Sequence, residues 1–351
     1  MKQRNISLDV LRILIMFMIV AGHALYHGGI LKTVTPFSIE YYIANFIEAL
    51  LVVHVNCFVL LSGYFLSKKQ FSFKRIFLLW GQMLFWSVLL FAVIFILNGS
   101  KTIDVKEVVK SFLPFTQQRY WFMTTYLLMY ILVPFLNAAI EYMPKRKLQC
   151  ALAMWFSVFV LLQNVFFWRN FTYFEIRSPL FFAFLYLVGA YIRKYGFSIK
   201  IPWVWGYILF TCVITLSQIV LDKLGITVFL SPDGRSLLYA YNSVTVVLSS
   251  VCFFMVFLNH KITYSSKLGR ITSLIAPLTL GVYLIHDHPN VREYIWEWLH
   301  PSAFSHSGIV MIIIVFVDVA LIFCVACLME KIRIYIAHKI ATLIFRNKST
   351  T

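Results

Sequence analysis

Charged residues are scarce in this sequence, and that scarcity limits what the protein can be. Only 13% of the 351 residues are Asp, Glu, Lys or Arg, whereas 61% are hydrophobic. Soluble domains carry about 25% charged residues. Apolar runs of about twenty residues, long enough to cross a bilayer as a helix, recur from one end of the chain to the other. These features exclude a soluble globule and predict an all-α, polytopic integral membrane protein.

Acidic residues and cysteines are also few, and neither shortage indicates a special chemistry. Fourteen Asp and Glu stand against 31 Lys and Arg, which gives a net charge of +17. The basic residues fall in short loops between apolar runs, so we attribute them to membrane orientation and predict no nucleic-acid partner. The six cysteines lie in or beside apolar runs. We interpret "CVAC" at 324–327 as small packing residues rather than a redox pair or a metal site.

Proline and glycine gather in no linker, and we find no internal repeat, so we predict one domain over residues 1–351 without a soluble accessory domain. Ten membrane spans are predicted, at about 8–26, 41–66, 76–98, 120–140, 148–168, 178–196, 202–221, 237–258, 271–288 and 308–328. An even number of spans places both termini on one side of the membrane. The outer segment "DVKEVVKSFL" has apolar residues at helical spacing and is expected to be an interfacial helix.

The distribution of basic residues predicts which side the termini occupy. With the N-terminus in the cytoplasm, 20 of the 31 Lys and Arg residues lie inside, 10 lie outside and Arg12 lies within the first span. Short cytoplasmic loops carry an excess of Lys and Arg in membrane proteins. We therefore expect both termini in the cytoplasm.

The first span carries three ionisable residues, Asp9, Arg12 and His23. Such groups cost about 2.5–3.5 kcal/mol each in hydrocarbon, so each needs a partner or a function. Arg12 and His23 are eleven positions apart, which places them on one helix face about 16 Å apart. Asp9 lies three residues before Arg12 and can pair with its guanidinium. The alternative is a snorkelling Asp9–Arg12 pair with His23 at the headgroups.

The second span adds Glu48 and His54, followed by Tyr64 toward the cytoplasm. Glu48 and His23 are expected within about two helical turns of each other in depth, where a carboxylate can orient an imidazole. The alternative is that Glu48 is protonated or bonded to a neighbouring group for packing. For His54 we expect a buried hydrogen bond.

Later polar residues have simpler interpretations. Trp121 opens the fourth span, where an aromatic belt accounts for it. His286, Asp287 and His288 end the ninth span. We predict no metal site there, because three successive residues point in different directions and no further ligand pattern accompanies them. Asp318 in the last span is expected to make a structural hydrogen bond.

Four stretches in order resemble the membrane-bound acyltransferase-3 family, the O-acyltransferases of surface polysaccharides and other envelope glycans. "LDVLRILIMFMIVAGH" has an arginine and a histidine with ten residues between them, as in that family. "CFVLLSGYFL", "YWFMTTYLLMYILVPFLN" and "GVYLIH" follow in the expected order over nearly the whole chain. The resemblance implies about ten helices, acetyl-CoA as a cytoplasmic acyl donor, a glycan acceptor such as capsule, exopolysaccharide or lipopolysaccharide, and a bacterial cytoplasmic membrane.

The resemblance also implies that His23 is the central catalytic residue, and a neutral imidazole suits the removal of a proton from an acceptor hydroxyl. The sequence leaves open whether His23 is this general base or itself accepts the acyl group. Some relatives carry two arginines three apart after the second span; here Ser72 occupies the first position and Lys74 supplies the second charge beside Arg75. No tightly bound cofactor is expected. We assign catalytic roles to His23, Arg12 and Glu48, supporting roles to Asp9, Trp121 and His286, and donor-binding roles to Lys74, Arg75 and Tyr64.

Two other classes of protein remain open at this point. A transporter or flippase for a lipid-linked glycan or small anion also lines its path with buried charges, although we find no pair of Gly- or Pro-broken helices in corresponding halves. The second class is an assembly partner within a polysaccharide synthesis complex. Acetyl transfer that depends on His23 separates the enzyme from both.

Overall fold

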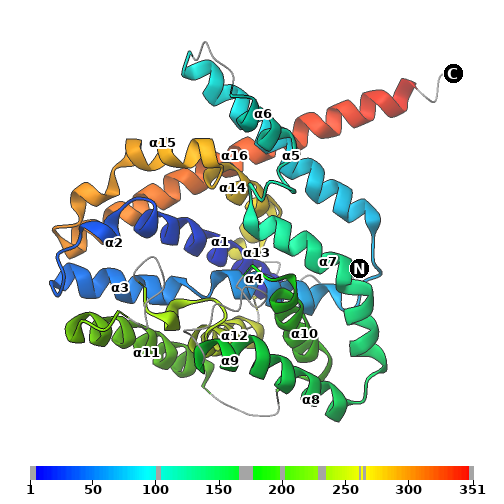
Figure 1. Ribbon diagram of the computed structural model, residues 1–351. Helices are drawn as coiled ribbons and strands as arrows, with labels where there is room; N and C mark the ends of the chain where they lie inside the picture. The colour runs from blue at the N-terminus through cyan, green and yellow to red at the C-terminus, as the bar shows by residue number, and fades with distance from the viewer. Residues whose placement is uncertain are drawn as a thin grey trace.

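The computed structural model describes residues 5–99, 104–165, 177–197, 202–227, 235–260, 262–263 and 266–347. Within these ranges the chain is helical and contains no β-strand, as Figure 1 shows. The helices that matter most for the site are α1 (Ile6–Tyr26), α3 (Ile39–Leu51), α4 (His54–Leu66), α5 (Phe73–Leu97), α7 (Trp121–Tyr142), α10 (Pro179–Tyr195), α14 (Thr279–His286), α15 (Pro289–Leu299) and α16 (Gly308–Asn347). The others are α2 (Ile30–Thr33), α6 (Val105–Phe112), α8 (Lys145–Phe156), α9 (Leu162–Val165), α11 (Trp203–Leu224), α12 (Val244–Asn259) and α13 (Lys267–Ile275).

Among the described residues, eight helical segments are long and apolar enough to cross a membrane. They are Ile6–Thr33, Ile39–Leu66, Phe73–Leu97, Trp121–Tyr142, Trp203–Leu224, Leu237–Asn259, Lys267–His286 and Gly308–Ile340. They coincide with eight of the ten expected spans and confirm an all-α, multi-pass membrane protein.

The two other expected spans are not among these eight segments, so the total of ten spans stays a prediction. The span expected at 178–196 is α10, which has 17 residues. The span expected at 148–168 consists of α8, five residues of π-helix at Ser157–Leu161, and α9. Residues 166–168 of that span lie outside the described residues.

Two expected spans are composite. The segment expected at 41–66 divides into α3 and α4, but Val52 and Val53 between them keep right-handed helical angles, so the direction of the chain is maintained. The segment expected at 271–288 consists of α13 and α14, joined by a 3₁₀ turn at Ala276–Leu278. Pro277 lies in that turn and has no backbone N–H to continue an α-helical ladder.

Helix α1 lies inside the bundle rather than at its edge. It packs against α3 and α4 on one side and against α14 and α16 on another, an arrangement visible in Figure 1. Leu8, Leu11, Ile15 and Val20 are completely buried. Asp9, the acidic residue of α1, is buried as well.

Helices α4 and α10 cross at two glycines. A Cβ atom added to Gly63 would lie on the backbone carbonyl of Tyr186, and one added to Gly189 would lie on that of Leu60, at 2.2 Å. Only glycine permits such a close approach of two backbones. The glycine of "SGY" therefore has a packing role.

The outer segment expected to be an interfacial helix is α6. Its N-cap is Asp104, whose carboxylate accepts a hydrogen bond from the backbone N–H of Lys106 at 2.8 Å. Val105, Val109 and Phe112 are exposed and share one face of the helix. The helix is confirmed, and its position at the membrane surface stays a prediction.

Candidate active site

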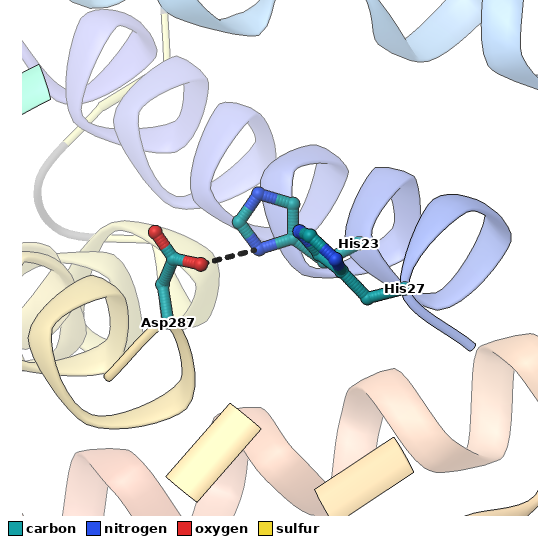
Figure 2. Close-up of side chains that lie close together, drawn as sticks. All are labelled: His23, His27 and Asp287. Carbon is teal, nitrogen blue, oxygen red and sulfur yellow. Dashed lines mark ion pairs between the residues drawn. The ribbon is translucent and has the colours of Figure 1, made fainter. Parts of the chain in front are cut away.

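His23 lies in the last turn of α1 and faces the end of α14. Its Nδ1 atom is 3.0 Å from Nε2 of His286 and 3.6 Å from Oδ1 of Asp287. Figure 2 shows Asp287 pointing at the His23 ring, with His27 one turn farther along the same helix. His286 is completely buried and Asp287 is buried, whereas 21% of the His23 side chain is exposed. His286, to which the sequence analysis assigns a supporting role, thus contacts His23, and that role stays a prediction.

The hydrogen bonds of the histidine pair specify which nitrogen of His23 is basic. Nδ1 of His286 lies 2.6 Å from the carbonyl oxygen of Val282, which can only accept a hydrogen bond. Nδ1 of neutral His286 therefore holds the proton, and its Nε2 is an acceptor. Nδ1 of His23 must donate to it, which leaves the lone pair of His23 on Nε2.

A carboxylate and an arginine complete the polar group around His23. Oδ1 of Asp287, the atom that faces His23, also accepts a hydrogen bond from Nη1 of Arg292 on α15 at 3.1 Å. Arg292 thus fixes the orientation of a buried negative charge beside the imidazole. That charge stabilises His23 when the ring takes up a second proton.

A cavity of about 660 Å³ opens at the other end of α1. Its lining from α1 is Asn5, Asp9, Arg12, Met16 and Ile19. These positions advance by three or four residues, so they form one helix face. The next position of that series is His23.

Cations surround the mouth of this cavity. Arg12 lines it, together with Lys68 and Lys69 from the α4–α5 connection, Arg75 from α5 and Arg193 from the end of α10. Nη1 of Arg12 binds Oδ1 of Asp9 at 3.1 Å, as the spacing predicts. The start of α1, the end of α4, the start of α5 and the end of α10 therefore meet at one end of the bundle, which agrees with the alternation of the predicted spans.

The inner end of the cavity approaches the histidines from two helices. Ile19 lies one turn before His23 on α1, and Tyr283 lies one turn before His286 on α14. Both residues line the cavity. The lining therefore ends one helical turn before His23 on α1 and one turn before His286 on α14.

A family model described as an acyltransferase domain, that of acyltransferase-3, matches residues 5–330. The chain belongs to the acyltransferase-3 family. It is a multi-pass membrane acyltransferase. No curated protein and no solved structure matches the chain.

The carboxylate beside His23 in this acyltransferase-3 protein is Asp287, and not Glu48 as expected. Glu48 forms an ion pair with Arg235, whose Nη1 also donates to Oδ1 of Asn45 at 2.8 Å. The guanidinium of Arg235 lies 4.3 Å from the centroid of the Tyr239 ring. In a poorly solvated site, a carboxylate binds a positioned guanidinium more strongly than it binds a neutral imidazole. Arg235, which Asn45 and Tyr239 hold in place, is therefore the preferred partner of Glu48. The alternative interpretation of Glu48, a bond to a neighbouring side chain, describes this contact.

The expected donor-binding residues are only partly at the cavity. Arg75 lines it, and Nη2 of Arg75 lies 3.5 Å from the hydroxyl of Tyr126. Lys74 is exposed and lies outside the described lining. Tyr64 contributes indirectly, because the guanidinium of Arg193 lies 4.6 Å from the centroid of its ring. Lys74 precedes Arg75 on α5 and is therefore rotated by about 100° from it around the helix axis.

Trp121 packs into an aromatic group that reaches α1. Its ring stacks on Tyr241 with centroids 6.1 Å apart, and Tyr241 lies 5.6 Å from the ring of His54. Nε2 of His54 is 3.7 Å from the position that a Cβ atom on Gly22 would occupy. Trp121 is thus connected to the segment of α1 beside His23 through the rings of Tyr241 and His54.

His23, His27 and Asp287 are residue types that bind metal ions, and their ligand atoms lie within 4.8 Å of one another. Two of the three already have strong partners, since His23 pairs with His286 and Asp287 pairs with Arg292. We therefore interpret the cluster as a hydrogen-bonded network. The prediction that the site holds no metal stays a prediction.

Sequence reasoning missed several contributors, among them Asp287 as the acidic neighbour of His23, Arg292 as the partner of Asp287, and Arg193 at the cavity. The spacing within "GVYLIHD" does indicate that Tyr283 and His286 share one helix face, with Asp287 directly after them. Nothing local relates that face to α1.

Proposed function

We propose that this protein transfers an acetyl group from cytoplasmic acetyl-CoA to a hydroxyl of a glycan on the outer side of the bacterial cytoplasmic membrane. The observation that carries the proposal is the single face of α1 that runs from a basic cavity, through Arg12, to His23. An acyltransferase with its donor and acceptor on opposite sides of a membrane needs such a connection.

The cavity fits an acyl-CoA at both of its ends. Five Lys and Arg side chains at the mouth, Arg12, Lys68, Lys69, Arg75 and Arg193, suit the phosphates of CoA. The inner part is apolar, with Met16, Ile19 and Met123 in its lining, and suits the thioester arm. The thioester would then lie at the end nearest His23.

His23 has the proton state that the reaction requires. Nε2 of His23 removes the proton of the acceptor hydroxyl as its oxygen attacks the thioester carbon, and the C=O electron pair moves to the carbonyl oxygen. When that pair returns, the C–S bond breaks. The CoA thiolate leaves and takes the proton from the His23 imidazolium. Asp287 offsets the charge of this imidazolium.

Labelled acetyl transfer in membranes tests the proposal. His23→Ala should abolish transfer to the glycan, and His23→Gln should fail as well, because an amide does not take up a proton at neutral pH. Protein level and membrane insertion should be unchanged, since neither substitution adds a charge. His306→Ala, at an exposed histidine after α15, is the matched control and should keep normal activity. Normal transfer by His23→Ala would contradict the proposed mechanism.

A further inference from the structure

Tyr283 stands where the donor cavity meets the histidine pair. It lines the inner end of the cavity, and only 4% of its surface is exposed. Its ring lies 5.9 Å from that of Phe122 and 6.3 Å from that of His286, between centroids. A thioester that enters far enough to reach His23 therefore passes this side chain.

The hydroxyl of Tyr283 is buried and makes no well-formed hydrogen bond to any described residue. It lies within weak hydrogen-bonding range of the backbone of Phe122 and of the carboxylate of Asp287. An unpaired buried hydroxyl costs about 1–3 kcal/mol, and native structures leave few such groups. By contrast, the neighbouring Tyr120 donates its hydroxyl hydrogen to the carbonyl of Leu284 at 3.0 Å.

The other polar groups of the described lining are already engaged or lie near the mouth. The hydroxyl of Thr279 donates to the carbonyl of Ala276 at 3.0 Å, and that of Ser62 donates to the carbonyl of Phe58 at 3.0 Å. The remaining inner lining is apolar, with residues such as Ile19 and Met123. Tyr283 thus brings to the apolar end of the cavity an O–H group whose hydrogen bonds to Phe122 and Asp287 are poorly formed.

We propose that the Tyr283 hydroxyl donates a hydrogen bond to the thioester carbonyl oxygen and stabilises the oxyanion that forms there. The inference rests on the proposed acyl transfer and adds a second catalytic residue to it. When a nucleophile attacks the thioester carbon, the C=O pair moves to this oxygen, and it returns when the C–S bond breaks. Tyr283 keeps its own proton throughout. Direct attack by the acceptor and transfer through an acylated His23 both create this oxyanion.

Tyr283→Phe removes the hydroxyl and little else, so it is the decisive variant. A single oxyanion donor typically contributes about 10²–10³-fold to kcat. We expect kcat to fall about 100-fold, with the KM for acetyl-CoA within about twofold of normal. The Tm of the purified protein should change little, because no well-formed hydrogen bond is lost. Binding of an S-ethyl CoA thioether, which has no carbonyl oxygen, should be unaffected.

Tyr120→Phe is the matched control, because it removes a buried hydroxyl that has a partner. It should lower the Tm while activity per folded molecule stays near normal. An unchanged kcat for Tyr283→Phe would overturn the inference, and so would a kcat that falls only in proportion to lost folded protein. His23→Ala assayed beside them separates the two proposals, since an active His23→Ala rejects the proposed mechanism whatever Tyr283 does.

Discussion

Nδ1 of His23 lies 3.0 Å from Nε2 of His286, a residue 263 positions later in the chain. The contact joins α1 to α14 at the end of the bundle remote from the basic cavity mouth. It also fixes the tautomer of His23, because His286 is itself held by the carbonyl of Val282. The tautomer of His23 therefore depends on the buried His286.

This dependence predicts the effect of removing the acceptor. His286→Phe should lower kcat about 10–100-fold with little change in KM, because Nδ1 of His23 loses its acceptor and the ring its orientation. His286→Gln should restore part of the rate, since its side-chain oxygen can accept the same hydrogen bond. The control is His288→Phe, which removes a bond to the carbonyl of Ser87 and should lower the Tm instead. Equal rates for both His286 variants would contradict the proposed orientation.

Arg12 should affect the donor more than the chemistry. Arg12→Lys removes the planar guanidinium that binds Asp9 and lines the cavity, and an ammonium cannot make two parallel bonds to a phosphate. We expect the KM for acetyl-CoA to rise about tenfold while kcat changes little. Lys74→Ala, at an exposed basic residue outside the cavity lining, should leave KM unchanged. Steady-state assays at varied acetyl-CoA concentration decide between these outcomes.

Glu48 should matter for stability and not for acyl transfer. Glu48→Ala leaves Arg235 without its carboxylate, and breaking this partly exposed ion pair should cost less than the roughly 3 kcal/mol of a fully buried one. Thermal unfolding in detergent should show the loss, while activity per folded molecule stays normal. The double variant Glu48→Ala, Arg235→Leu should regain part of the Tm. A fall in kcat with an unchanged Tm would contradict this prediction and indicate a catalytic role for Glu48.

The crossing of α4 and α10 predicts a strong response to one methyl group. Gly63→Ala or Gly189→Ala should prevent normal packing and sharply reduce folded protein, because the new Cβ atom meets backbone that cannot move aside. Gly81→Ala on α5 is the control, since a Cβ atom there has no neighbour within 4 Å. Size-exclusion profiles and Tm values measure the difference, and a stable, monodisperse Gly63→Ala protein would refute the close crossing.

The predicted orientation is testable with single cysteines in a background that lacks the six natural ones. Lys69→Cys, at the cavity mouth, should react with a membrane-impermeant maleimide only after cells are permeabilised. His306→Cys, at an exposed position on the opposite end, should react in intact cells. The reverse pattern would place the basic mouth outside, where acetyl-CoA is absent.

The sequence by itself determined the features that depend on local composition. Apolar runs specify membrane helices because backbone groups in lipid must bond within their own segment. The eleven-residue spacing of Arg12 and His23 specifies a shared face because the helical repeat is fixed. For the same reason the Asp9–Arg12 pair was predictable.

Only the tertiary structure decided which distant groups meet. The sequence gives the depth of Glu48 and Asp287 in the membrane, but each helix is free to rotate about its axis until packing fixes the face that it presents. That rotation pairs Glu48 with Arg235 and brings Asp287 to His23. It also brings Arg193 to the cavity that Arg12 lines. Helix periodicity within one span carries no information about the rotation of its neighbours, so the candidate site arises from packing between spans.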